Sequence, residues 1–130
     1  MMKDGSIVKK LLKIEDERGK IIVLEDNEIP FTIKRVFVTF HKKGVRGNHA
    51  HKKTEQVVMC LKGSMKIKLI NSNLNIEYEL SEPYVALYIP PMTWTELYSI
   101  AEDSVILVFA SERYEKLDYI GDLEAFMSMI

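Results

Sequence analysis

The stretch that decides the fold runs from Val45 to Glu55 and reads V-R-G-N-H-A-H-K-K-T-E. It places His49 and His51 two residues apart, with Arg46 before them and two lysines after them. Side chains two apart on a strand lie on the same face of a sheet. We therefore expect both imidazoles to face one space, the inside of a small β-barrel.

Short strand-like segments lie on both sides of this stretch, with turn residues between them. Some alternate apolar and polar residues, and others are continuous apolar runs. About ten short strands at roughly 8–12-residue spacing indicate an all-β sandwich or barrel. Besides the histidine-containing stretch, the expected strands are residues 7–14, 20–25, 33–40, 55–61, 65–70, 75–80, 85–89, 94–98 and 105–110.

The C-terminal tail has a different pattern. From Asp118 onward the apolar residues fall at helical spacing. They are Ile120, Leu123, Phe126, Met127 and Ile130. We expect a short C-terminal helix that packs on the barrel and has no chemical role. Without a linker, repeat or low-complexity segment, residues 1–130 are predicted to form a single domain.

Composition restricts the partners and the compartment. The net charge is −1 and the pI is near 6.3, so no global field attracts nucleic acid or an anionic membrane. The single cysteine, Cys60, lies in an apolar run and predicts a reducing compartment, here the cytoplasm. The longest purely apolar stretch, residues 105–110, is too short to span a bilayer.

The histidine pair permits either metal binding or acid–base chemistry. The stretch resembles the first motif of the cupin superfamily in the spacing of Gly44, His49, His51, Glu55 and Gly63. Two imidazoles and the Glu55 carboxylate could form a facial metal triad. However, Thr95 stands where the second cupin motif has its histidine, and nearby Arg46 disfavours a cation. We therefore predict no metal and no cofactor, with histidine acting as a proton acceptor and donor.

Arg35 lies among apolar residues in an expected strand, so its guanidinium needs an anionic partner. Arginine is well shaped for phosphate oxygens, and Arg46 adds a second cation beside the histidines. An internal ion pair is the alternative for Arg35 and is left open. Lys52 and Lys53 are expected to form a solvated face.

At a finer level, the chain resembles the sugar 3,4-ketoisomerases of the cupin superfamily over nearly its whole length. The most specific motif is R-G-N-H-A-H-K-K, residues 46–53. The supporting motifs are I-P-F-T-I-K-R-V (29–36), E-Q-V (55–57), C-L-K-G-S (60–64), L-Y-I-P-P (87–91), A-S-E-R-Y (110–114) and D-Y-I (118–120).

The resemblance implies a jelly-roll-like cupin barrel that isomerises thymidine-diphosphate 4-keto-6-deoxyglucose without a metal. His49 would be the main acid/base, and His51 would hold oxygens or relay a proton. Arg46, Arg35 and Arg18 would bind the nucleotide sugar. The family also implies a homodimer with intertwined strands, in which residues 7–14 are the expected exchanged strand. A pyridoxal-phosphate aminotransferase would consume the product to make a 3-amino-3,6-dideoxy sugar.

Some residues depart from the family pattern. Phe37 and Val38 stand where tyrosines are common, and Thr95 replaces a histidine that would face the sugar. The configuration at C4 of the product is therefore left open. The alternatives are a non-catalytic nucleotide-sugar binding cupin, a metal-dependent cupin using His49, His51 and Glu55, and a nucleotide-sugar 3,5-epimerase.

Overall fold

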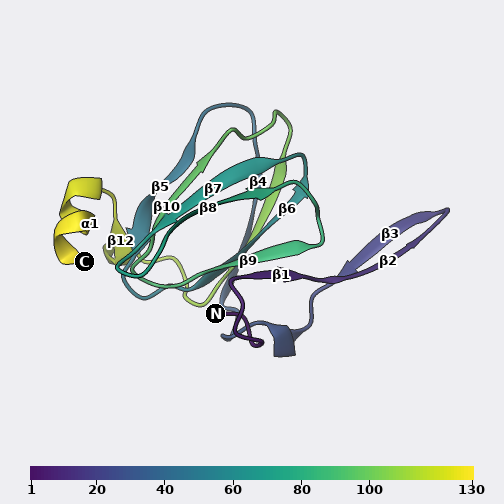
Figure 1. Cartoon of the computed structure of the whole chain (residues 1–130), viewed down its shortest axis with the longest axis horizontal. Coiled ribbons are helices and arrows are strands. Elements are labelled where there is room, and N and C mark those ends of the chain that lie inside the picture. Colours follow the sequence, from purple (N-terminus) through teal and green to yellow (C-terminus); the bar gives the residue numbers. More distant parts are fainter.

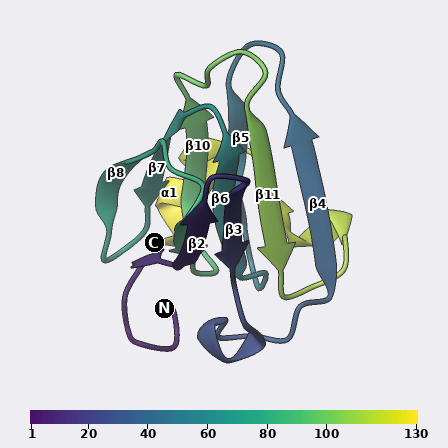
Figure 2. The same ribbon diagram turned by 90° about the vertical axis from the view of Figure 1, so that its right-hand side faces the viewer.

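The computed structural model describes residues 1–130 as two five-stranded antiparallel sheets and a separate hairpin. The strand orders are β1-β9-β6-β11-β4 and β12-β5-β10-β7-β8, and the hairpin is β2-β3. The strands are β1 (Val8–Lys10), β2 (Leu12–Asp16), β3 (Gly19–Val23), β4 (Arg35–Phe40), β5 (Arg46–His51), β6 (Gln56–Lys62), β7 (Met65–Ile70), β8 (Asn75–Leu80), β9 (Val85–Ile89), β10 (Trp94–Tyr98), β11 (Val105–Ala110) and β12 (Tyr119–Ile120). The hairpin projects from one end of the barrel, and helix α1 (Leu123–Met129) lies at the other (Figures 1 and 2).

The main core lies between the two sheets. In β7, Met65, Ile67 and Leu69 are fully buried and alternate with half-buried residues, as the period of a strand requires. They pack against apolar side chains of β6, β9 and β11 from the other sheet, with Cys60 buried among them. The predicted all-β, jelly-roll-like barrel with a short C-terminal helix is confirmed.

Helix α1 begins at Leu123, five residues later than the helix expected from Asp118. Residues Lys116–Asp118 form a short 3-10 turn, and Tyr119 and Ile120 pair with β5. The side chain of Asp122 caps the helix by accepting a hydrogen bond from the backbone N–H of Ala125. The delay arises because the segment after Asp118 is held as a strand at the edge of the sheet.

The expected N-terminal strand 7–14 is two strands that run in different environments. β1 pairs with β9 inside the barrel sheet, and the buried Leu11 then ends this pairing. β2 pairs only with β3, and this hairpin exposes Leu12, Ile14 and Ile21 by 51–61%. The hairpin projects away from the barrel (Figure 1), and the rest of its own chain leaves these apolar side chains uncovered.

Strand β4 leaves a second uncovered edge. Its only neighbour in the sheet is β11, and Val36, Val38 and Phe40 are exposed by 44–75%. An unpaired strand edge offers free N–H and C=O groups for another strand. Helix α1 is the sole α-helix, and no helix of the chain is long and apolar enough to cross a membrane.

Candidate active site

The backbone of β5 is irregular just before the histidines. Gly47 has φ +82°, and a Cβ there would lie 2.8 Å from the carbonyl oxygen of Thr95, so only glycine fits. Asn48 also has a positive φ of 57°. The pairing of β5 with β10 shifts register beside this point, with Thr95 opposite His49. The irregular backbone thus fixes the direction in which His49 leaves the sheet.

His49 is held in one tautomer by the backbone. Its Nδ1 lies 3.0 Å from the carbonyl oxygen of Gly47, which only accepts, so Nδ1 carries the proton and donates. The lone pair of the neutral ring is then on Nε2. Burial lowers the pKa of His49 from its ordinary 6.5, and the bond to Gly47 opposes this shift. His49 is therefore neutral at pH 7 and can accept a proton through Nε2.

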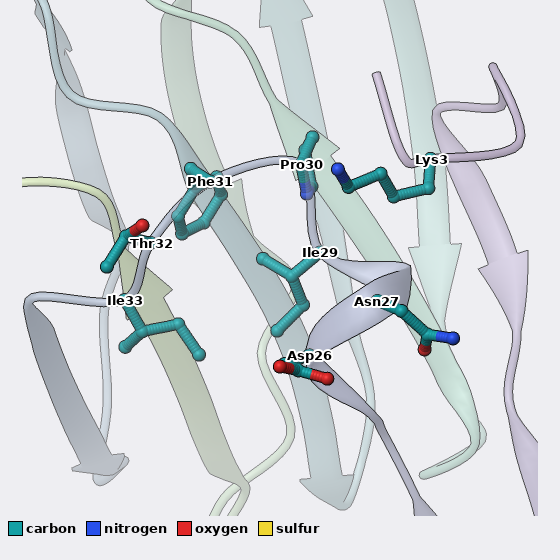
Figure 3. A pocket seen from close by; sticks show the side chains of 8 residues that line it. All are labelled: Lys3, Asp26, Asn27, Ile29, Pro30, Phe31, Thr32 and Ile33. Carbon is teal, nitrogen blue, oxygen red and sulfur yellow. The ribbon is translucent and has the colours of Figure 1, made fainter.

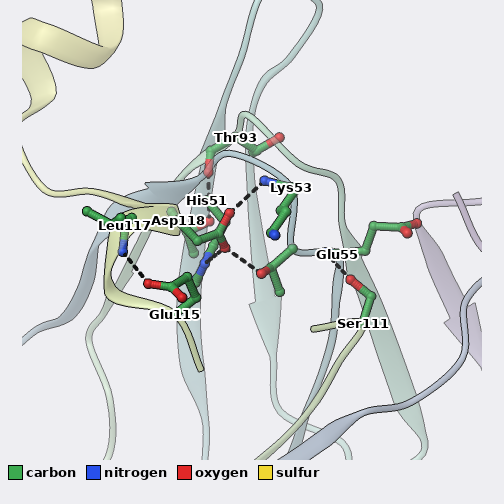
Figure 4. A network of polar contacts seen from close by, with 10 residues as sticks. His51, Lys53, Glu55, Thr93, Ser111, Glu115, Leu117 and Asp118 are labelled. Atoms are coloured by element: carbon green, nitrogen blue, oxygen red, sulfur yellow. Dashed lines mark hydrogen bonds and ion pairs between the residues drawn. The ribbon is translucent and has the colours of Figure 1, made fainter. Parts of the chain in front are cut away.

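His51 is held by a carboxylate instead. Its Nδ1 lies 3.0 Å from Oδ2 of Asp118, which also accepts from the Thr54 hydroxyl, while Oδ1 accepts from the backbone N–H of Lys53 (Figure 4). Burial acts to raise the pKa of Asp118, but these hydrogen bonds together lower it. Asp118 is therefore ionised, and Nε2 of His51 carries the lone pair. Burial also lowers the pKa of His51, against the effect of Asp118.

The two imidazoles lie side by side, as expected from their spacing. Their ring centroids are 4.9 Å apart in an edge-to-face arrangement, and the Tyr119 ring packs 5.1 Å from His49 and 4.4 Å from His51. Nε2 of His51 is buried and has no hydrogen-bond partner. An unpaired buried nitrogen is unfavourable, and the folded chain itself supplies no partner for the Nε2 lone pair of His51.

His49 lines a cavity of about 170 Å³ between the two sheets. Arg46 and Thr95 line it too, together with apolar residues of β6, β9 and β11. His51 is not part of this lining, so of the two imidazoles expected to face the inside of the barrel only His49 lines its cavity. A larger cavity of about 590 Å³ lies around Ile29 to Ile33, but it contains no histidine or arginine (Figure 3). The acid–base groups therefore place the candidate site at the smaller cavity.

Arg35 and Arg46 are not paired with carboxylates, so the internal ion pair considered for Arg35 is absent. Nε of Arg35 is buried without a hydrogen-bond partner, and its guanidinium lies 5.6 Å from the Phe37 ring and 5.9 Å from the Tyr114 ring. Its charge also acts on His51, where it favours the neutral ring. Two uncompensated guanidinium groups beside the histidines make this region suitable for an anion. Lys52 and Lys53 are exposed, as expected.

Arg18 lies apart from the other predicted site residues within one chain. It stands at the tip of the β2-β3 hairpin, pairs with Asp16 at 2.6 Å, and its side chain is 87% exposed. The barrel cavity is not lined by Arg18. A role in the site therefore requires the hairpin to reach a second copy of the chain.

The metal-binding alternative needs His49, His51 and Glu55 in one place. The Glu55 carboxylate instead accepts a hydrogen bond from the Tyr88 hydroxyl at 2.7 Å, away from both histidines. The chain contains no cluster of three or more histidine, cysteine, aspartate or glutamate side chains positioned to hold a metal ion. The ligand set of that alternative is not assembled.

Comparison with known proteins places this site in a family. The sequence matches the family described as "FdtA: WxcM-like, C-terminal" over residues 4–130. The chain belongs to this family. A TDP-4-oxo-6-deoxy-alpha-D-glucose-3,4-oxoisomerase from Aneurinibacillus thermoaerophilus is 44% identical over 121 residues, which cover 91% of this chain and 87% of that protein.

Solved structures of ketoisomerases share the fold. A 3,4-ketoisomerase from Helicobacter canadensis matches with a TM-score of 0.88 and 34% identity, covering 94% of both chains. The sugar 3,4-ketoisomerase QdtA from Thermoanaerobacterium thermosaccharolyticum, solved with TDP, matches with a TM-score of 0.86 and 39% identity, covering 94% of this chain and 91% of that one. The resemblance to cupin-type sugar 3,4-ketoisomerases is confirmed, and with it the prediction of an isomerase.

The epimerase alternative receives support only for its fold. The rmlC epimerase of Mycobacterium tuberculosis matches with a TM-score of 0.76 at 14% identity, covering 86% of this chain and 66% of that one. Sequence reasoning missed the contact between Asp118 and His51, although the D-Y-I motif that begins at Asp118 was part of the resemblance. Asp118 is 67 residues from His51, so no local pattern connects them.

Proposed function

We propose that this protein converts TDP-4-keto-6-deoxyglucose to a TDP-3-keto-6-deoxyhexose by acid–base catalysis with histidine. The observation that carries the proposal is the free Nε2 of His49 on a cavity that Arg46 also lines. The relative that is 44% identical bears the name of this activity.

The reaction moves a carbonyl group by one carbon without any net change in composition. We propose that Nε2 of His49 takes the proton from C3, so that the electrons of that bond form the C3=C4 bond of an enolate with its charge on O4. The hydrogen of the C3 hydroxyl moves to O4, and delivery of a proton to C4 leaves the carbonyl at C3. We propose that Nε2 of His51 relays the proton between O3 and O4. This role requires the bound sugar to reach past the cavity to His51, whose Nε2 is buried and unpaired in the free chain.

The intermediate is anionic, so nearby cations lower its free energy. We propose that Arg46 and Arg35 bind the diphosphate and stabilise this charge, since neither is neutralised by a carboxylate of the chain. Thr95, opposite His49 on β10, would contact the sugar through its hydroxyl. A threonine is smaller than the histidine of the family pattern and does not titrate. The configuration at C4 is not assigned.

We propose that the active form is a homodimer in which the β2-β3 hairpin of one chain lies against the barrel of the other. The exposed apolar residues of the hairpin and the open edge of β4 support this arrangement. Residues 12–23, rather than the expected 7–14, are then the exchanged segment. Arg18, at the hairpin tip, would contribute to the partner's site. A cytoplasmic location and an aminotransferase that consumes the product stay predictions.

The direct test is NMR of the product formed from TDP-4-keto-6-deoxyglucose in deuterated water. We expect a 3-keto product with deuterium at C4, and deuterium at C3 only in 4-keto substrate that the reverse reaction re-forms. His49→Asn should lower kcat by at least about a thousandfold, because the base is lost, while TDP still binds. The matched control is Lys52→Gln, an exposed neighbour on the same segment, which should keep wild-type activity.

Several outcomes would contradict the proposal. Binding of the sugar nucleotide without isotope uptake would favour the non-catalytic binding cupin. Label at C5 would favour a 3,5-epimerase. Loss of activity with a chelator and recovery with iron, zinc or manganese would favour the metal-dependent alternative.

A further inference from the structure

His41 is the third histidine of the chain, and it has no part in the proposed reaction. It follows β4 directly and is only 2% exposed. Its backbone N–H donates to the carbonyl oxygen of Ser104 at 2.9 Å, and its carbonyl oxygen accepts from the N–H of Asp103 at 3.1 Å. Ser104 is itself fully buried. His41 is thus fixed to the barrel wall at the start of the loop that leads to β5.

The ring of His41 contacts Arg46. Nε of Arg46 lies 3.1 Å from Nδ1 of His41. A guanidinium has donors only, so Nδ1 of His41 is the acceptor. The ring proton of His41 is therefore on Nε2, which is buried without a partner.

The buried, unpaired Nε2–H of His41 is unfavourable for folding, so a histidine at this position needs a compensating role for its other ring nitrogen, Nδ1. A buried donor without a partner destabilises the folded chain, and an apolar side chain would fill the same space without that cost. That role is to accept the hydrogen bond from Nε of Arg46. No carboxylate of the chain pairs with Arg46, so His41 provides its only side-chain hydrogen bond.

We propose that His41 is a positioning residue for Arg46. By occupying Nε, it leaves the four N–H groups of the two terminal nitrogens free, and these form the end-on fork of the guanidinium. The side-on fork, which needs Nε, is not available. His41 thus determines that Arg46 binds two oxygens of the TDP diphosphate through its two terminal nitrogens, and not through Nε and one terminal nitrogen. This inference rests on the proposed function of the site.

The first test is the affinity for TDP of His41→Leu and His41→Asn, measured by titration calorimetry. Leucine fills the space without an acceptor, whereas the side-chain oxygen of asparagine can take the place of Nδ1. We expect His41→Leu to raise the Kd about tenfold and His41→Asn to raise it by less than about threefold. KM should rise with the Kd, and any fall in kcat should again be larger for His41→Leu than for His41→Asn.

The same substitution in an Arg46→Ala background separates positioning from packing. If His41 acts through Arg46, His41→Leu changes the Kd less than about twofold once Arg46 is absent. An equal loss of affinity in both backgrounds would overturn the assignment. So would equal losses for His41→Leu and His41→Asn.

A spectroscopic test needs no substitution. In nitrogen-15-labelled wild-type protein, a scalar coupling across the N–H···N bond should connect Nε of Arg46 with Nδ1 of His41. A proton bonded to Nδ1 of His41 would exclude this bond and overturn the inference. Wild-type protein that isomerises the substrate but lacks the coupling would reject His41 alone. Wild-type protein that neither binds TDP nor turns over would reject the proposed function and this role together.

Discussion

At the scale of single residues, His49 and His51 are the same side chain held in two different ways. Each donates through Nδ1, but His49 donates to a neutral carbonyl and His51 to an ionised carboxylate. A carboxylate stabilises an imidazolium more than a carbonyl does. His51 is therefore better suited to act as a transient proton carrier. His49 is better suited to act as the base that removes a proton from carbon.

The lowered pKa values of the two histidines predict the pH dependence of the enzyme. A base must be neutral to act, and burial keeps His49 and His51 neutral below their ordinary 6.5. We therefore expect kcat/KM to be constant near pH 7 and to fall only as the pH drops through the lowered values. The midpoint of this acidic limb should lie below pH 6.5. A midpoint above 6.5, with TDP affinity constant over the same range, would contradict the assignment.

The network of Asp118 predicts a specific defect for Asp118→Asn. All three groups that bond the Asp118 carboxylate are hydrogen-bond donors. In asparagine one carboxylate oxygen becomes an NH2 group, so this new donor must face at least one of the three existing donors. We expect kcat to fall at least about tenfold because His51 loses its fixed tautomer. The free energy of unfolding should fall by about 1–3 kcal/mol.

Glu124→Gln is the control for this substitution, because it makes the same chemical change on the exposed face of α1. It should leave both kcat and the denaturation midpoint unchanged. An Asp118→Asn variant with wild-type turnover would show that the carboxylate has no part in the reaction.

At the scale of elements, five strands could be predicted to the residue: β7, β8, β9, β10 and β11. Some alternate, as β7 does, and others are continuous apolar runs, as β11 is, but each is bounded by polar or turn residues that set its ends. The two ends of the chain could not be predicted in this way. Leu11 is buried where the chain passes from the barrel to the hairpin, and Asp118 is used by His51 before the helix begins. Both depend on contacts distant in sequence.

Helix α1 is short and depends on one side chain for its packing. Phe126 is fully buried, and its ring centroid lies 5.9 Å from that of Trp94 on β10. We expect Phe126→Ala to lower the free energy of unfolding by about 3–5 kcal/mol. Met127→Ala is the control, since Met127 is 47% exposed and should cost less than about 1 kcal/mol. Urea denaturation measures both, and equal effects would mean that the helix does not pack as described.

At the scale of the whole molecule, the hairpin decides whether the candidate site is complete in one chain. Pattern alone could place His49 and His51 side by side because they are two apart on one strand. It could not place Arg46 on the same cavity as His49, since they are three residues apart and only the irregular backbone between them brings both to it. It could not place Arg18, because a position relative to a second copy leaves no periodic signal in one sequence. The structure of one chain separates Arg18 from the cavity.

Mixed dimers test whether Arg18 acts on the partner's site. Arg18→Ala and His49→Asn should each be nearly inactive alone. Co-expressed, the two variants should recover about a quarter of wild-type activity, since half the dimers are mixed and each has one complete site. No recovery in a mixed dimer that is verified by mass spectrometry would show that Arg18 does not act across the interface.

Cys60 gives the barrel a natural reporter of its own opening. It is the only thiol, it is 1% exposed, and burial raises its pKa, so little thiolate forms and no reagent reaches it in the closed state. Alkylation by iodoacetamide must therefore wait until the two sheets separate. The rate at which the protein gains the mass of the alkyl group in native buffer then reports how often the barrel opens. A bound nucleotide slows this rate in proportion to the stability that binding adds to the closed barrel.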